Sequence, residues 1–363
     1  MIKVLVVDDS PLMRKLLGRI LSAQSDMETS FARNGDEALT KLGPLQPDVI
    51  TLDIQMPGMD GLACLDRIMI ERPCPVVMVS SMSTEGAQAT LDALRLGAVD
   101  FVAKPEGALS LHMDVFGPEL IAKVRSAVNA RPKASARLRE RVQHRIGAAA
   151  TIGRVLVSQS NGASFARPAG AGVVVVGCST GGPPALEALL SPLPATFPWP
   201  IVVAQHMPVS FTGPLARRLD RICDLGVSEV EAVTPLESGR VYVGRGDGDV
   251  VVASCGGVAV AMPIASEDYP WRPSADRLVR SAMALFPPSQ IVGVLMTGMG
   301  YDGAAAMNRL RELGGRTIAE SEDTAVVWGM PGELVKNGGA TFVLPLQKIA
   351  AKLQQIAPDA AAT

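Results

Sequence analysis

Short apolar runs alternate with amphipathic stretches along the first 125 residues of the chain. The runs are rich in Val, Ile and Leu, as buried parallel strands are, and helical patterns separate them. We expect strands at residues 4–7, 49–52, 76–79 and 101–103, a weaker one at 29–32, and helices at 12–21, 35–42, 62–71 and 86–96. Repeats of this kind predict a doubly wound α/β domain on a five-stranded parallel sheet at residues 1–125.

A second series of strand-like runs begins at residue 173. We expect strands at 173–176, 201–204, 226–230, 240–243, 250–252 and 291–295. An Asp247-Gly248 pair between two valine-rich runs is typical of a hairpin turn. The pattern predicts a second doubly wound α/β domain at residues 169–358, with a mostly parallel sheet and an antiparallel edge hairpin.

The segment at 126–168 is rich in Arg, Ala, Ser and Gly, which is typical of an interdomain linker. The slightly different stretch from Arg125 to Arg167 contains nine Lys or Arg residues and one acid, so this stretch carries +8 while the rest of the chain carries −10. A positive segment can bind nucleic acid, but no aromatic residue lies between Arg125 and Asn161 to stack on bases. We interpret it as a solvated linker and expect no nucleic-acid partner.

The composition favours a folded cytoplasmic protein. Apolar residues make up 48% of the 363 and charged residues 19%, which allows two hydrophobic cores. The five cysteines form no C-x-x-C pair, so we expect neither a disulfide framework nor a zinc site. The N-terminus lacks the pattern of a signal peptide. No apolar stretch approaches the ~18 residues of a membrane span, so no membrane insertion is expected.

Acidic residues follow the first and third predicted strands. Asp8 and Asp9 come after residues 4–7, and Asp53 comes after 49–52. Because parallel strands end at one edge of a sheet, these carboxylates should converge, and Mg²⁺ would relieve their repulsion. Ser80 and Lys104 follow the next two strands at the same edge. Such a set suits phosphoryl transfer to an aspartate, whereas helix capping by Asp8 and Asp9 would leave the other three unexplained.

These motifs resemble those of response-regulator receiver domains, which have a flavodoxin-like fold, across residues 2 to about 122. The matching stretches are VVDDS at 6–10, LDIQMPGMDG at 52–61, VSS at 79–81 and DFVAKP at 100–105. The resemblance implies that a chemotaxis-type histidine kinase donates a phosphoryl group to Asp53 and that Asp8 and Asp9 help Asp53 to bind Mg²⁺. The resemblance also implies that Ser80 and Phe101 relay the conformational change that follows phosphorylation. Lys104 would pair with the phosphoryl group.

The strand at 173–176 runs into a glycine-rich loop, GCSTGG at 177–182. Ser179 lies at the strand end beside the start of a predicted helix, whose N–H groups can stabilise an oxyanion. The loop lacks the Gly-Lys-Ser/Thr of a P-loop and the glycine spacing of a dinucleotide loop. It matches the G-x-S-x-G of the α/β-hydrolase nucleophile elbow. Cys178 is a rival nucleophile, but its place next to Ser179 on a strand exit should point it away from the site.

The candidate base is a histidine at a neighbouring strand end. The chain has three histidines: His112, His144 and His206. His206 directly follows the strand at 201–204, which places it to activate Ser179. No Asp lies between the two and Glu187 lies within a helix, so the α/β-hydrolase order fails. Asp302, after the strand at 291–295, is the best orienting acid, because triads are recognised by role and not by chain order. Taken singly, His206 could also be a hydrogen-bonded core histidine, Ser179 a turn serine and Asp302 a helix N-cap.

Residues from about 170 to 357 resemble the catalytic domain of chemotaxis protein-glutamate methylesterases, a family in which a receiver domain precedes this domain. The matching stretches are GCSTGG at 177–182, QHMP at 205–208, RPSAD at 272–276, TGMGYDG at 297–303 and GMP at 329–331. The resemblance implies hydrolysis of γ-glutamyl methyl esters on methylated chemoreceptors, often with deamidation of receptor glutamines. Ser179, His206 and Asp302 match the family's triad, and we expect oxyanion support from Thr180 and Met299. No cofactor is expected for this reaction.

The fusion of the two domains suggests regulation of the second by the first. The unphosphorylated receiver would cover the catalytic cleft, and phosphorylation of Asp53 would favour an uncovered arrangement. A tenfold activation needs only about 1.4 kcal/mol. One alternative is a non-catalytic signalling adaptor. Another is a DNA-binding regulator, but the glycine-rich strand–loop units do not resemble a recognition-helix module.

Overall fold

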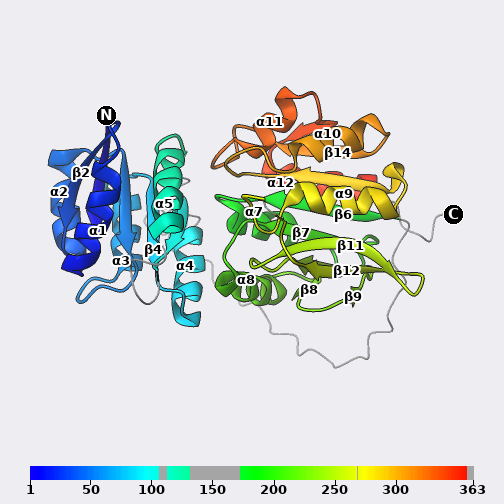
Figure 1. The fold of residues 1–363 in the computed structure, drawn as a ribbon, viewed down its shortest axis with the longest axis horizontal. Helices are drawn as coiled ribbons and strands as arrows, with labels where there is room; N and C mark the ends of the chain where they lie inside the picture. The colour runs from blue at the N-terminus through cyan, green and yellow to red at the C-terminus, as the bar shows by residue number, and fades with distance from the viewer. Residues whose placement is uncertain (106–112, 131–171, 268, 358–363) are drawn as a thin grey trace, which may run out of the picture.

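The computed structural model describes residues 1–105, 113–130, 172–267 and 269–357, which form two α/β bodies lying side by side (Figure 1). The last helix of the first body ends at Val128, past the predicted boundary at 125. Most of the predicted linker, from 131 to 168, lies outside the described residues, as do His112 and His144. Within the described part of the chain, no helix has the length and apolarity needed to cross a bilayer.

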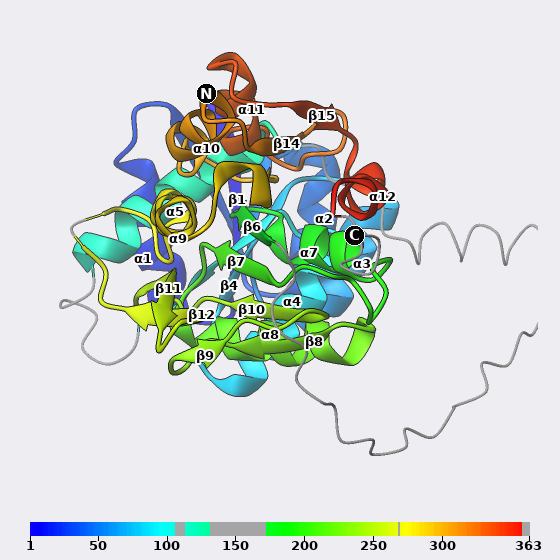
Figure 2. The ribbon, with the colours of Figure 1, turned by 90° about the vertical axis from the view of Figure 1, so that its right-hand side faces the viewer.

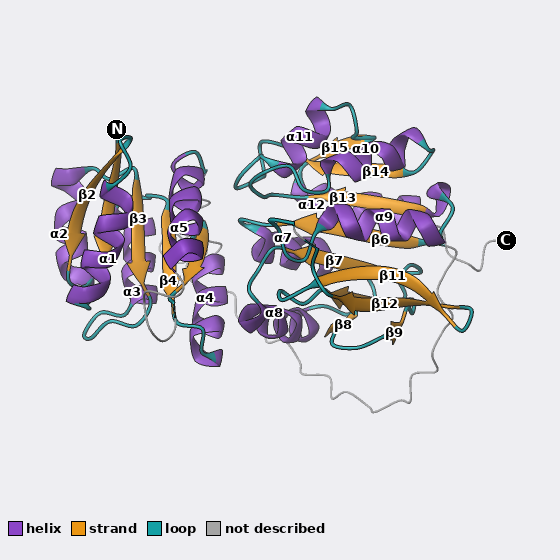
Figure 3. Ribbon diagram, in the orientation of Figure 1, coloured by secondary structure: helices purple, strands orange, loops and turns teal. Residues whose placement is uncertain are grey.

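The first body is a five-stranded parallel sheet with helices on both faces (Figure 3). Its strands, in the order β2-β1-β3-β4-β5, are β1 (Ile2–Val7), β2 (Met27–Ala32), β3 (Val49–Asp53), β4 (Val76–Ser80) and β5 (Asp100–Ala103). Its helices are α1 (Pro11–Ser22), α2 (Gly35–Leu45), α3 (Gly61–Glu71), α4 (Thr84–Leu96) and α5 (Met113–Val128). Alternate strand residues point to opposite faces, so Val4 and Val6 pack with α1 and α5, whereas Leu5 and Val7 pack with α2, α3 and α4.

The second body has a seven-stranded parallel sheet, in the order β15-β14-β13-β6-β7-β10-β8, and a separate three-stranded sheet. The parallel strands are β6 (Val173–Cys178), β7 (Ile201–Gln205), β8 (Gly226–Glu229), β10 (Arg240–Val243), β13 (Ile291–Leu295), β14 (Arg316–Glu320) and β15 (Phe342–Leu344). The antiparallel strands are β9 (Thr234–Pro235), β11 (Asp249–Cys255) and β12 (Val258–Ile264). Strands β13, β6 and β7 are adjacent at the centre, which brings their carboxyl ends together.

Helices cover both faces of the seven-stranded sheet (Figure 2). Val174 and Val176 of β6 face α7 (Gly182–Leu190), α8 (Val209–Ile222) and α12 (Leu346–Ile356). Val173 and Val175 face α9 (Ala275–Leu285), α10 (Ala304–Glu312) and α11 (Met330–Lys336). A short 3₁₀ helix, η2 (Pro288–Gln290), precedes β13. The buried runs of valine at the sheet centre therefore separate two apolar cores.

The predicted hairpin exists, but its position was wrong. β10 pairs in parallel with β7 and β8, so the Asp247-Gly248 turn does not join two antiparallel strands. The hairpin is formed instead by β11 and β12, and the turn between them contains Gly256 and Gly257, both with positive φ. Both runs that flank Asp247 are rich in valine, and their local pattern does not reveal which sheet each one joins.

The two bodies meet through α4 of the first and α7 and α8 of the second. Phe101 of β5 packs on Phe211 of α8, with ring centroids 4.3 Å apart. Arg218 of α8 reaches back across the contact, where it pairs with Asp92 of α4 at 2.7 Å and with Glu187 of α7 at 2.5 Å. The contact thus combines an apolar centre with a charged bridge.

Candidate functional site

Ser179 lies one residue beyond the end of β6, in the tight loop that leads into α7. Its N–H donates to Thr297 O at 3.0 Å, and its own carbonyl accepts from Gly182 N at 2.8 Å. The loop depends on glycine: Gly181 has φ +76°, and a Cβ at Gly298 would lie 2.8 Å from Ser179 Cβ. These contacts hold the serine, which remains partly accessible, at the sheet edge.

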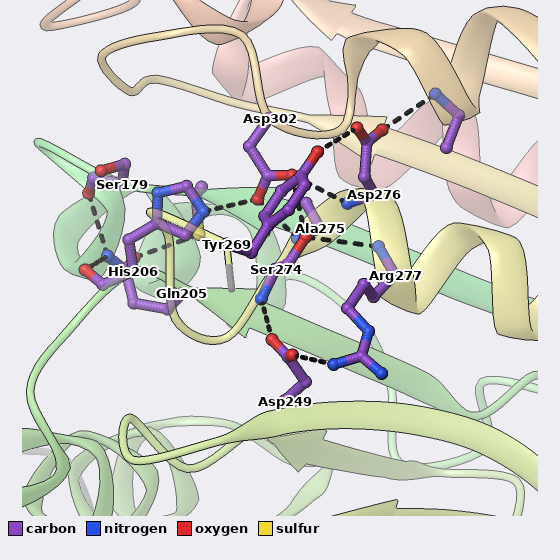
Figure 4. A network of polar contacts seen from close by, with 12 residues as sticks. Ser179, Gln205, His206, Asp249, Tyr269, Ser274, Ala275, Asp276, Arg277 and Asp302 are labelled. Carbon is purple, nitrogen blue, oxygen red and sulfur yellow. Dashed lines mark hydrogen bonds and ion pairs between the residues drawn. The ribbon is translucent and has the colours of Figure 1, made fainter. Parts of the chain in front are cut away.

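His206 and Asp302 form a hydrogen-bonded pair across two strand ends. His206 follows β7 and Asp302 follows β13, and the distance from Nε2 to Oδ2 is 2.8 Å. The other ring nitrogen, Nδ1, is buried and has no hydrogen-bond partner among the described residues. Figure 4 shows the imidazole with Ser179 on one side and Asp302 on the other. The structure therefore brings the three residues singled out from the sequence into one place, and Nδ1 is the nitrogen free to accept a proton.

Asp302 is held as an anion at the start of α9. Its carboxylate accepts hydrogen bonds from Ser274 Oγ at 3.0 Å, Ala275 N at 2.7 Å and Asp276 N at 3.0 Å (Figure 4). Burial acts to raise the pKa of Asp302, but the His206 contact and these N–H donors outweigh it, so the pKa lies below its ordinary value. The helix N-terminus adds a favourable dipole. The sequence did not signal this support, although Ser274 lies in the RPSAD stretch.

The residues expected to support an oxyanion, Thr180 and Met299, lie in the two loops that flank Ser179. Thr180 is buried, and its carbonyl accepts from Thr297 Oγ1 at 2.9 Å. Met299 is partly buried and follows Gly298, which pairs with Trp328. Their role in holding an oxyanion stays a prediction.

An aromatic group lies beside the imidazole. The Trp271 ring is nearly parallel to that of His206, with centroids 6.2 Å apart, and Tyr301 meets Trp271 edge-on at 4.7 Å. Tyr269 also contacts Trp271, and its hydroxyl donates to Asp276 at 3.0 Å. Tyr301 is 60% exposed. The group therefore presents an apolar wall next to His206, which the sequence did not signal, because aromatic residues are common in cores.

The acidic cluster forms at the sheet edge of the first body. Oxygen atoms of Asp8, Asp9 and Asp53 lie within 4.8 Å of one another. Lys104 Nζ is 2.7 Å from Asp53 Oδ2 and 3.1 Å from Asp8 Oδ2. Burial raises the pKa of Asp53, and the charge of Asp8 raises it further against the opposing effect of Lys104. Three converging carboxylates supply hard oxygen donors, which fit Mg²⁺.

The two predicted relay residues lie on adjacent strands of the first body. Ser80 is buried at the end of β4, where its hydroxyl donates to the carbonyls of Ser81 and Gly86, both at 3.2 Å. Phe101 is buried against the second body. The carboxylate next to it, Asp100, accepts a hydrogen bond from the Thr180 hydroxyl. The sequence did not signal that this residue touches the loop of Ser179.

Cys178 does not point toward a substrate. It is fully buried, its thiol donates to Gln205 Oε1 at 3.1 Å, and burial raises its pKa. A buried thiol of this kind is a poor nucleophile.

Comparison with known proteins identifies both bodies. The family model for CheB methylesterase matches residues 174–353, and that for the response regulator receiver domain matches 4–115. A protein-glutamate methylesterase/protein-glutamine glutaminase of Rhodopseudomonas palustris is 53% identical over 356 residues, with 97% of each chain covered. One of Rhodospirillum rubrum is 50% identical, with 97% of this chain and 95% of the relative covered. The crystal structure of the Thermotoga maritima CheB methylesterase catalytic domain is 38% identical, has a TM-score of 0.49, and covers 51% of this chain and 98% of that one.

Proposed function

This chain belongs to the CheB methylesterase family with an N-terminal receiver domain, and on that premise we propose that it hydrolyses glutamyl methyl esters of chemoreceptors under the control of phosphorylation. Methanol is the leaving product. Deamidation of receptor glutamines belongs to the proposal, because the similar proteins are also named protein-glutamine glutaminases. The names of these relatives support catalysis over the non-catalytic adaptor.

The observation that carries the proposal is the His206–Asp302 pair with its unpartnered Nδ1 beside Ser179. In the proposed reaction, Nδ1 takes the proton of Ser179 Oγ as the oxygen attacks the ester carbonyl. The protonated imidazole then gives that proton to the departing methoxide, which leaves as methanol. Water, deprotonated by the same nitrogen, cleaves the glutamyl-serine ester and regenerates both groups. An amide substrate would follow the same route with ammonia as the leaving group.

Asp302 has a supporting role in this reaction. An ionised carboxylate bonded to Nε2 keeps the proton of neutral His206 on that atom and leaves Nδ1 free to act as base. It also stabilises the imidazolium that forms in the transition state. The N–H groups of α9 and the Ser274 hydroxyl fix its orientation. Backbone N–H groups at Thr180 and Met299 would stabilise the oxyanion.

Phosphorylation would act through the first body. Asp53 would accept the phosphoryl group, with Mg²⁺ held by Asp8, Asp9 and Asp53 and supplying positive charge that neutralises the phosphoryl oxygens. Lys104 would move from its carboxylate partners to the phosphoryl group.

Contacts between the bodies support control by covering. Asp100 bonds the Thr180 hydroxyl next to the nucleophile, and Phe101, a predicted relay residue, packs on Phe211. A rearrangement of Phe101 on phosphorylation would therefore disturb contacts beside Ser179. Deletion of residues 1–125 should raise the basal activity, and an isolated second domain no faster than the unphosphorylated whole chain would contradict the covering proposal.

The direct test is methanol release from receptor membranes methylated in advance, with wild type, Ser179→Ala and the control Ser191→Ala. Ser191 is the exposed C-cap residue of α7 and its hydroxyl donates to Glu187 O, so its removal leaves the site intact. We expect release by wild type and the control, and a loss of about 10⁶ in kcat for Ser179→Ala. Circular dichroism establishes that the variants fold. Retained activity in folded Ser179→Ala would remove this serine from the mechanism.

A further inference from the structure

Gln205, the last residue of β7, lies between the proposed nucleophile and the proposed base. Its side-chain Nε2 donates to the carbonyl of Ser179 and to that of His206, both at 3.0 Å (Figure 4). The residue is only 1% exposed. One amide group thus joins the exits of β6 and β7, at the point where the strand register pairs Cys178 with Gln205.

The orientation of this amide follows from its surroundings. Oε1 accepts from the Cys178 thiol at 3.1 Å, while the two carbonyls on the other side can only accept. A reversed amide would place its oxygen against both carbonyl oxygens, and these acceptors would face one another with no hydrogen between them. Gly182 leaves room for this amide, because a Cβ at that position would overlap Oε1. Burial raises the pKa of the Cys178 thiol, which keeps it a neutral donor.

We propose that Gln205 is a positioning residue, oriented by Cys178, that sets the spacing between Ser179 and His206. The inference rests on the proposed function, in which these two residues exchange a proton. A shift of about 1 Å between reacting groups can cost about 100-fold in rate. The Gln205 amide holds the main chains of Ser179 and His206, so its loss should lower kcat and have little effect on receptor binding.

The test compares Gln205→Met, which keeps the volume and loses both donors, with Thr317→Val as a matched control. Thr317 is also buried in this sheet, and its hydroxyl donates to Gly339 O, away from Ser179. Gln205→Met should lower kcat about 10- to 100-fold and change KM less than about twofold, at a melting temperature similar to that of the control. Thr317→Val should keep the wild-type kcat. Folded Gln205→Met with the wild-type kcat would overturn the proposal.

The cysteine provides a second readout, which decides the matter if Gln205→Met fails to fold. Cys178→Ala removes the donor to Oε1 and should lower kcat, whereas Cys178→Ser keeps a donor and should restore most of it. Equal kcat for wild type and Cys178→Ala would overturn the proposal. The rate at which a fluorophosphonate labels Ser179 is measured alongside, because it reports nucleophile activation without any receptor. Slower labelling of Gln205→Met and Cys178→Ala than of wild type would support the positioning role of Gln205, even if wild type releases no methanol. A lack of methanol release by wild type would count against the proposed substrate alone.

Discussion

Removal of Asp92 should raise the basal esterase activity of the unphosphorylated protein. Asp92 of α4 pairs with Arg218 of α8 at 2.7 Å, and this ion pair bridges the two bodies. Asp92→Ala is a milder change than loss of Arg218, because Arg218 keeps Glu187 as a partner at 2.5 Å and no buried charge is stranded.

The expected size of the rise in basal activity follows from the solvent exposure of the Asp92 side chain. The Asp92 side chain is 46% exposed, so solvent screens the pair and its contribution is at the level of surface ion pairs, about 0.5–1 kcal/mol. If the closed arrangement dominates, this loss raises the open population, and with it the rate of methanol release, about two- to fivefold. Phosphorylated protein, already open, should respond much less.

The assay is the initial rate of methanol release with and without beryllofluoride, which mimics the phosphoryl group on Asp53. Glu71→Ala is the matched control, because Glu71 is 45% exposed and pairs with Arg67 within α3. The control should leave the basal rate unchanged. A basal rate for Asp92→Ala equal to that of the control would refute the bridge as a closing contact. An equal rise in both states would show that the variant acts on catalysis and not on opening.

Further predictions concern the candidate sites. Asp302→Asn should fold and lower kcat about 10³- to 10⁴-fold in the methanol assay, because Nε2 loses its anionic partner. The pKa of Asp302 is lowered from 3.8, so its ionised form stabilises the fold above that pH and this stability is lost as the pH falls through the folded value. The melting-temperature gap between wild type and Asp302→Asn should therefore be constant near neutral pH and shrink below about pH 3.8. Acetyl phosphate should phosphorylate Asp53 only with Mg²⁺, so EDTA or Asp53→Asn should abolish the labelling. Tyr301→Ala should raise KM for receptor about two- to tenfold with kcat nearly constant, because an exposed aromatic contact is lost; an unchanged KM would contradict a role in binding.

Much of the site could be anticipated because its chemistry is local in the sequence. Asp8, Asp53, Ser179 and His206 stand at a strand end or one residue beyond it, and Asp302 lies in the loop after β13. Strand runs are visible in the sequence as apolar segments. Parallel strands end on the same edge, so the convergence of these side chains follows from fold class alone. The position of the hairpin did not follow, because pairing partners are chosen by packing between distant segments.

The five strands of the first body, the two α/β classes and the reactive groups at the strand ends could be predicted from sequence, because periodicity and side-chain chemistry are properties of neighbouring residues. Strands β9, β12, β14 and β15 of the second body were not predicted. Packing between distant segments determines which nitrogen of His206 meets Asp302, how Gln205 joins the loops of Ser179 and His206, and that Asp100 touches Thr180. Those contacts join residues on different strands or in different bodies. They depend on the register of β6 and β7 and on how α4 packs against α7 and α8, and no local pattern encodes either.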